Sequence, residues 1–237
     1  MFLKANLSFS LLSSGTRLST QFASNIINSE TAEDGRYSYA QVSIQQPTTA
    51  SGSYLHQCGG SLIAPDIILT AAHCRNLIDR IYIDVYNLIV DTESAKIYTV
   101  QNITIHPQFD EELFRYDFAV VHINEYVDFL SPIRLNSDPT IPLLTDDLTV
   151  LGWGAIQAAT TTTNSLYPST LQKGYVQAMT NENCEATVIN GLSLYEGEIF
   201  DDRSEERRVG KECRPLWPRV ILILVIKLVV LRFHLRR

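Results

Sequence analysis

Six short runs rich in β-branched and aromatic residues follow one another between turn signals, and this pattern constrains the fold most. Several of the runs alternate apolar with polar residues, which is typical of strands that bury one face. Many short strands without long helical periods predict an all-β barrel or sandwich, and six strands suffice to close a small barrel. The runs are YAQVSIQ (39–45), GGSLIA (59–64), DIILTAA (66–72), RIYIDVYNLI (80–89), KIYTVQNITI (96–105) and DFAVVHI (117–123).

A second β-rich region begins at LTVLGWG, residues 148–154, and continues at GYVQAMT, residues 174–180. A proline-containing connector, residues 124–147, separates it from the first region. The threonine-rich stretch 158–165 is interpreted as a solvated surface loop. We therefore expect one β unit that ends near residue 125 and the start of another from about residue 146.

Charge and cysteine content exclude several classes of function. Residues 1–202 carry 9 basic and 23 acidic residues, and such an acidic body predicts no nucleic-acid partner. The four cysteines, Cys58, Cys74, Cys184 and Cys213, suit a secreted protein and lack the CxxC spacing of a zinc site. We expect no metal ion and no cofactor.

The sequence has two weak signals of export. Residues 1–25 contain a short, serine-interrupted apolar stretch that we interpret as a weak signal or propeptide region. Glycosylation tripeptides occur at Asn6 and Asn102, although such tripeptides commonly arise by chance.

The C-terminal region differs from the rest in charge. Residues 203–237 carry 10 basic and 3 acidic residues, and RSEERRVGKEC at 203–213 matches the in-frame translation of a common sequencing-library adapter. We interpret 203–237 as an artefactual tail and exclude it from the fold. A rival interpretation makes 220–231 a membrane anchor, but a spanning helix needs about 20 apolar residues, and this run is shorter and contains Lys227. No membrane partner is expected.

The most informative motif is CGGSLIAPDIILTAAHC, residues 58–74. It predicts a hairpin that turns at Pro65-Asp66 and runs directly into His73. An isolated Ala-His-Cys would indicate only a partly buried histidine and a core cysteine. The whole string resembles the histidine motif of trypsin-like (chymotrypsin-family, S1) serine proteases. The resemblance implies a double antiparallel β-barrel, with His73 as general base and acid. It also implies a Cys58–Cys74 disulfide, which would close a loop of about 15 residues and contribute roughly 3 kcal/mol.

A second motif is YDFAVV, residues 116–121, in which Asp117 opens an apolar strand. Burying an unpaired carboxylate is costly, so Asp117 needs a partner. Taken alone it would be a strand-start or capping residue. The resemblance implies that Asp117 orients His73 and stabilises its imidazolium form. His106 and His122 are interpreted as structural.

Two further segments extend the resemblance over residues 26–202, which implies a first barrel over about 26–125 and the start of a second over about 146–202. LGWG, residues 151–154, resembles the start of the second barrel in the family. Ile26-Ile27-Asn28-Ser29 resembles the mature N-terminus that activation cleavage releases. Cys184 is predicted to lack its usual partner.

The family's Gly-Asp-Ser-Gly-Gly segment, which supplies the nucleophile and the oxyanion hole, does not occur in the 237 residues. Neither Ser193 nor Ser204 has flanking glycines. The second barrel is therefore expected to be incomplete, and the chain as it stands is expected to be inactive.

The resemblance implies a secreted, extracellular serine endopeptidase (EC 3.4.21.-) that cleaves protein or peptide substrates through an acyl-enzyme and is a monomer in its full-length parent. One alternative is a catalytically inactive, protease-like binding protein. Another is an unrelated all-β interaction module.

Overall fold

The computed structural model describes residues 29–33, 40–49, 52–138, 147–157 and 166–179, with short segments at 182–183, 186, 188–189, 192–193, 205–208 and 211–215. Several predictions concern other residues. The Ile26–Asn28 segment, the loop at 158–165, Cys184 and the apolar run at 220–231 lie outside the described residues.

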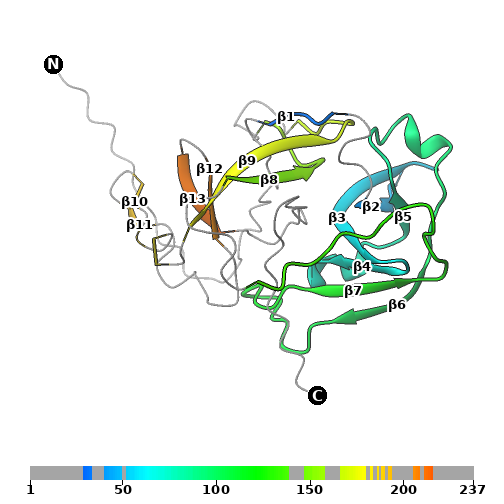
Figure 1. The fold of residues 1–237 in the computed structure, drawn as a ribbon, viewed down its shortest axis with the longest axis horizontal. Coiled ribbons are helices and arrows are strands. Elements are labelled where there is room, and N and C mark those ends of the chain that lie inside the picture. Colours follow the sequence, from blue (N-terminus) through cyan, green and yellow to red (C-terminus); the bar gives the residue numbers. More distant parts are fainter. Residues whose placement is uncertain are drawn as a thin grey trace.

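The first β unit is a six-stranded antiparallel sheet that curls into a barrel (Figure 1). The barrel closes between the first and last strands of this sheet. Ile81, in the first strand, and Tyr98, just before the last strand, exchange two backbone hydrogen bonds of 2.9 and 3.3 Å. The all-β prediction is confirmed. The strands, in the order β5-β2-β3-β4-β7-β6, are β5 (Arg80–Ile83), β2 (Gln41–Pro47), β3 (Tyr54–Ala64), β4 (Ile67–Thr70), β7 (Ala119–Ile123) and β6 (Val100–Ile105).

Alternation along the strands fills the centre of this barrel. In β7, Ala119, Val121 and Ile123 are buried, whereas Val120 and His122 are partly exposed. Successive side chains of a strand point to opposite faces, so the inward set of each strand meets the inward sets of the others. The core formed in this way also includes Val42, Ile44, Leu62, Ile68 and Ile81.

The run at 80–89 is shorter as a strand than its composition predicts. β5 ends at Ile83 because Asp84 has φ 62°, a left-handed conformation that ends an extended strand. The chain then enters a loop that contains the short 3-10 helix η2 (Asp91–Glu93). The Asp91 carboxylate accepts the backbone N–H groups of Tyr86 and Asn87 at 2.8 and 2.7 Å, which holds this loop together.

The second sheet is built on β8 (Asp147–Gly152) and β9 (Gln172–Met179), which pair antiparallel as the sequence predicts. β1 (Glu30–Thr31) also pairs with β9, although its residues fall in the range expected for the first barrel. An ion pair of 2.9 Å between Lys173 Nζ and Glu30 accompanies this pairing, and its hydrogen bond raises the pKa of Lys173. The N-terminal strand therefore belongs with the second sheet.

Two short strands within residues 205–215 also pair with this sheet. β12 (Glu205–Arg208) pairs with β9, and β13 (Lys211–Pro215) pairs with β12. A free strand edge offers N–H and C=O groups to any extended segment, whatever its side chains. The edges of this sheet, β8 and β13, are not paired with each other in the described part of the chain. A separate hairpin joins β10 (Val188–Ile189) and β11 (Leu192–Ser193).

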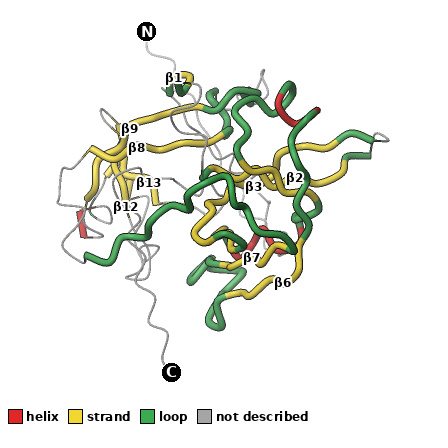
Figure 2. Tube along the Cα trace, turned by 45° about the vertical axis from the view of Figure 1, so that its right-hand side comes forward, coloured by secondary structure: helices red, strands yellow, loops and turns green. Residues whose placement is uncertain are grey.

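The two sheets lie side by side in both views (Figures 1 and 2). Hydrogen bonds of Tyr86 link them. Its carbonyl accepts the indole N–H of Trp153 at 3.1 Å and the backbone N–H of Leu171 at 2.9 Å. Its hydroxyl donates to the carbonyl of Ala32 at 2.9 Å. One residue of the first barrel therefore contacts three segments that pack with the second sheet.

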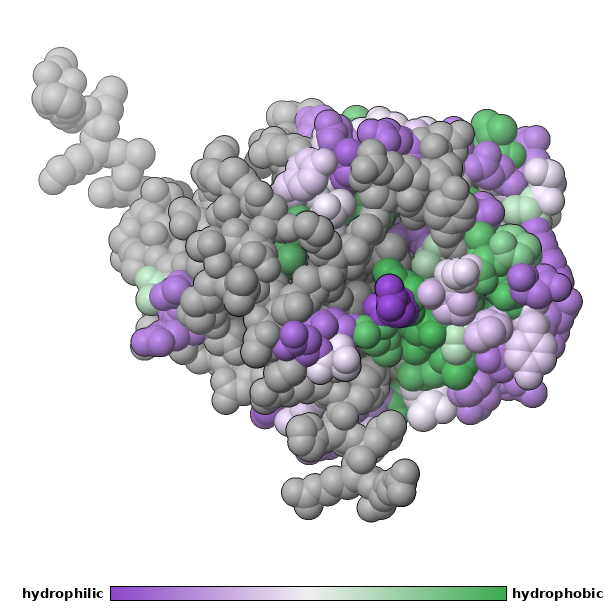
Figure 3. All heavy atoms as spheres, in the orientation of Figure 1, coloured by the Kyte–Doolittle hydropathy of each residue, from purple (hydrophilic) through white to green (hydrophobic). Residues whose placement is uncertain are grey.

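The surface of the first barrel carries apolar side chains in the middle of the face seen in Figure 3, with polar side chains around them.

None of the helices in the described part of the chain is long and apolar enough to cross a membrane.

Candidate active site

His73 follows directly from the β3–β4 hairpin. After β4, Ala71 is still extended, with φ −85° and ψ 149°, and the chain then tightens into the 3-10 helix η1 (Ala72–Asn76). The hydroxyl of buried Thr70 donates to the carbonyl of Gly59 at 2.8 Å, which ties the end of β4 to β3. The predicted hairpin therefore holds the backbone that carries the imidazole.

Asp117 reaches the same place because β4 and β7 are antiparallel neighbours. Thr70, the last residue of β4, pairs with Ala119, the first residue of β7. His73 lies three residues after this pair and Asp117 lies two residues before it. The register of the sheet therefore brings together two residues that are 44 positions apart in the sequence.

The Asp117 carboxylate binds His73 twice. Oδ1 accepts the backbone N–H of His73 at 2.9 Å, and Oδ2 contacts Nδ1 of the ring at 2.7 Å. An ionised carboxylate can only accept hydrogen bonds, so Nδ1 carries the proton. In neutral imidazole the lone pair then lies on Nε2. The two side chains are only 12% and 11% exposed, so little water competes for these bonds.

The segment before Asp117 wraps over the histidine. Phe114 presents its ring edge-on to His73, with centroids 5.9 Å apart and an interplanar angle of 89°. Phe114 and Tyr116 have φ of 51° and 52°, unusual values for residues with side chains. The Tyr116 ring stacks on His106 at 4.9 Å, in keeping with a structural role for that histidine. No sequence pattern marks Phe114 as a neighbour of His73; only the turn of this segment brings it there.

Acidic residues of the same segment remain at the surface. Glu111 is 66% exposed and accepts a hydrogen bond of 2.8 Å from Arg75. An exposed pair of this kind contributes little to stability. This agrees with the interpretation of the charged run as solvated.

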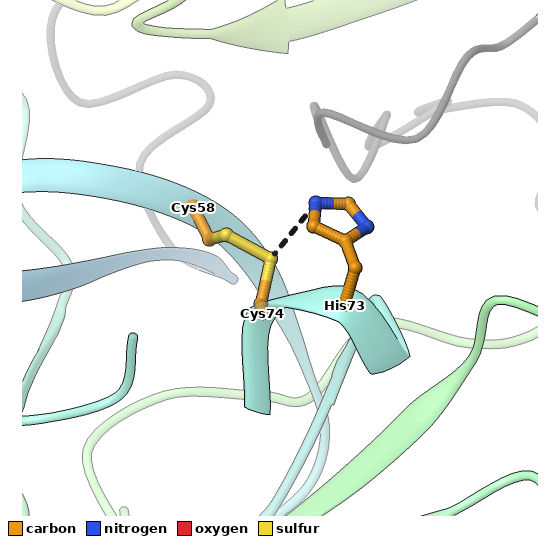
Figure 4. Close-up of side chains that lie close together, drawn as sticks. All are labelled: Cys58, His73 and Cys74. Atoms are coloured by element: carbon orange, nitrogen blue, oxygen red, sulfur yellow. Dashed lines mark hydrogen bonds between the residues drawn. A yellow bond between two sulfur atoms is a disulfide. The ribbon is translucent and has the colours of Figure 1, made fainter. Parts of the chain in front are cut away.

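A disulfide joins Cys58 of β3 to Cys74 of η1, beside His73 (Figure 4). Both cysteines are buried, and Nε2 of His73 lies 3.5 Å from Cys74 Sγ. The ligand atoms of Cys58, His73 and Cys74 all lie within 4.8 Å of one another, as in a metal site. A cysteine binds a metal ion as a thiolate, and the disulfide leaves neither sulfur in that form.

His56 is a second partly buried histidine, which the sequence motifs do not reveal. Its Nδ1 lies 2.9 Å from the hydroxyl of Ser43, and its ring meets that of Trp153 edge-on at 5.2 Å. Removal from water lowers the pKa of His56 to about 4. This imidazole is therefore neutral near pH 7 and bridges the first barrel to the tryptophan of the second.

Neither Ser193 nor Ser204 has the flanking glycines expected of the nucleophile. Ser193 lies in β11, where its backbone pairs with Val188, and Ser204 lies outside the described residues. The described part of the site thus consists of a positioned imidazole, its carboxylate and the neighbouring disulfide.

Comparison with known proteins agrees with this geometry. The family model described as Trypsin matches residues 26–203. The chain belongs to the trypsin family. It is 34% identical to coagulation factor XI of Bos taurus over 139 residues, which are 55% of this chain and 21% of that protein. It is 33% identical to chymotrypsin-C of Mus musculus over 150 residues, 61% of this chain and 53% of that protein.

One further relative and one solved structure are also similar to this chain. Serine proteinase stubble of Drosophila melanogaster is 31% identical over 74% of this chain and 23% of its own length. The trypsin-family chain thus spans little more than half of chymotrypsin-C and less than a quarter of the two larger relatives. The solved structure described as "Structure of GrC" shares the fold, with a TM-score of 0.63, 18% identity, and coverage of 77% of this chain and 75% of that one.

Proposed function

We propose that the full-length parent of this chain is a serine endopeptidase that cleaves protein or peptide substrates, with His73 and Asp117 as two members of its catalytic triad. The observation that carries the proposal is the double hydrogen bond from His73 to the Asp117 carboxylate, at 2.9 and 2.7 Å. It orients the ring through Nδ1 and keeps Nε2 available as a base.

The chemistry follows from this orientation. A serine hydroxyl transfers its proton to Nε2 as its oxygen attacks the substrate carbonyl, and Asp117 stabilises the imidazolium that forms. The imidazolium returns the proton to the leaving amine, which leaves an acyl-enzyme. Water then attacks the acyl group with the same histidine as base, and the serine is regenerated.

The nucleophile must come from a segment that the 237 residues do not contain, because Gly-Asp-Ser-Gly-Gly is absent from them. We propose that the authentic sequence departs from this one near Asp202. The adapter-like string at 203–213 and the reversal of charge there support this division. The chain as it stands then lacks peptidase activity.

An extracellular, monomeric parent fits the same reasoning. The buried Cys58–Cys74 disulfide requires an oxidising compartment to form and persist. The acidic body of the chain offers no basic surface for nucleic acid.

A fluorophosphonate probe, which labels activated serines, tests the proposal on the 237-residue chain and on the completed parent. We expect labelling and peptide cleavage by the parent alone, and loss of both in its His73→Ala variant. His122→Ala serves as the matched control, because His122 lies on β7 and is partly exposed. Undiminished turnover by His73→Ala, or specific labelling of the 237-residue chain, would contradict the mechanism.

The competing function is a protease-like binding protein without catalysis. Proteins of this kind have usually lost triad residues, whereas His73 and Asp117 are both present here. The missing serine segment does not count for this function, because the whole region from residue 203 is replaced. A completed parent that folds, carries the serine segment and still fails to react with the probe would favour this second function.

A further inference from the structure

Asn102 begins the tripeptide Asn102-Ile103-Thr104 on β6, a feature that the proposed peptidase function does not use. The structure separates the three residues by face. Asn102 and Thr104 are exposed, whereas Ile103 is partly buried and packs against the barrel core. The amide nitrogen of Asn102 lies 3.3 Å from the hydroxyl oxygen of Thr104 and donates to it. The two polar groups of the tripeptide are therefore neighbours on one outward surface.

β6 also lies at the outside of the molecule. It is the last strand in the order of the first sheet and pairs with β7 alone among the described strands. Both views show it as the outermost strand of its barrel (Figures 1 and 2). A bulky group on Asn102 therefore extends into solvent without displacing a neighbouring strand.

The position is also separated from the candidate active site. Ile105 pairs with Ala119, two residues after Asp117, whereas Asn102 pairs with His122 at the other end of β7. Three residues of strand, roughly 10 Å, separate Asn102 from Ile105. The attachment point therefore lies towards the end of β6 away from the Asp117 side of the sheet.

We propose that Asn102 carries an N-linked oligosaccharide in the mature protein. The proposal rests on entry into the secretory pathway and not on catalysis. The donor is an oligosaccharide linked to a dolichyl diphosphate. The Asn102 amide nitrogen bonds to the anomeric carbon of the first sugar and loses one proton. The bond from that carbon to the diphosphate oxygen breaks, and the diphosphate leaves with the electron pair.

The fold makes this modification compatible with the native state. Transfer takes place on the chain before folding is complete, so a sugar at an inward position would prevent the barrel from closing. Asn102 avoids this because its neighbour Ile103 supplies the inward side chain instead.

The test uses the full 237-residue chain expressed in eukaryotic cells behind a heterologous cleavable signal peptide. Entry into the secretory pathway then does not depend on residues 1–25. We expect a mobility shift that peptide N-glycosidase abolishes, and conversion of Asn102 to aspartate in the released peptide by mass spectrometry. Because the readout is the sugar, its failure is independent of any failure of the peptidase proposal.

Three variants of the tripeptide and one control variant make the assignment specific. Asn102→Gln and Thr104→Ala should each abolish the shift assigned to Asn102, whereas Thr104→Ser should keep it because a hydroxyl remains. Asn6→Gln, in the second tripeptide, controls for modification there and should leave that shift unchanged. An unmodified Asn102 in material whose signal peptide has been removed and whose Cys58–Cys74 disulfide has formed would overturn the proposal.

Discussion

Asp117→Asn is the sharpest test of the proposed dyad because it changes one atom and preserves shape. The carboxylate offers an acceptor to each of two N–H groups of His73, at 2.9 and 2.7 Å. The amide offers one acceptor and one NH2 group. If its oxygen stays on the ring, the NH2 group faces the backbone N–H, and an unsatisfied donor in so buried a site costs about 1–3 kcal/mol.

The alternative arrangement is therefore favoured. The amide oxygen stays on the backbone N–H of His73, and the NH2 group turns toward Nδ1, which must then accept. The ring proton moves to Nε2, and the imidazole can no longer take a proton from serine. In the trypsin-family proteases for which it is known, this substitution lowers kcat by about 10⁴-fold, equivalent to about 5 kcal/mol.

Two measurements check this reasoning. In the completed parent, kcat for a peptide substrate should fall on this scale in Asp117→Asn. Glu112→Gln, which removes the same charge from an exposed side chain in the neighbouring loop, should leave kcat nearly unchanged. In the 237-residue chain, ¹⁵N NMR of the His73 ring should report a proton on Nδ1 in the wild type and on Nε2 in the variant. An unchanged tautomer together with full activity would refute the assigned role of Asp117.

Three further outcomes concern stability. Reducing the Cys58–Cys74 disulfide, or replacing both cysteines by serine, should lower the free energy of unfolding by roughly 3 kcal/mol in denaturant titrations; peptide mapping that finds both as free thiols in secreted material would exclude the bridge. Gly60→Ala should lower it by about 1–3 kcal/mol, because an added Cβ meets Ile68 Cγ2 at 2.9 Å and the Leu69 carbonyl at 3.2 Å; an unchanged urea midpoint would show that the site can relax. The pKa of His56 is about 4 in the folded protein and 6.5 in the unfolded chain, so its contribution to the free energy of unfolding is fully present above pH 6.5. As the pH falls toward 4, the free energy of unfolding should drop by up to about 3 kcal/mol. The same drop in His56→Gln would assign it to other groups.

The amino-acid sequence by itself determined which segments become strands and which residues have the chemistry. Apolar residues at a spacing of two, as in β7, specify a half-buried strand because side chains alternate between faces. The string at 58–74 likewise indicated a histidine at the end of a hairpin. Such inferences depend on contacts between residues close in the chain, which a sequence displays directly.

Only the tertiary structure decided which distant residues meet. The contact of Phe114 with His73 depends on the left-handed backbone of Phe114 and Tyr116. The pairing of β1 with β9 depends on an edge of β9 that is available for a strand from a distant part of the sequence. The same holds for Tyr86. The sequence predicts one continuous strand over 80–89, but the chain turns at Asp84, and Tyr86 then forms hydrogen bonds that link the two sheets. Backbone hydrogen-bonding groups are alike at every residue, so side-chain patterns carry little information about which partner an edge or a loop carbonyl will find.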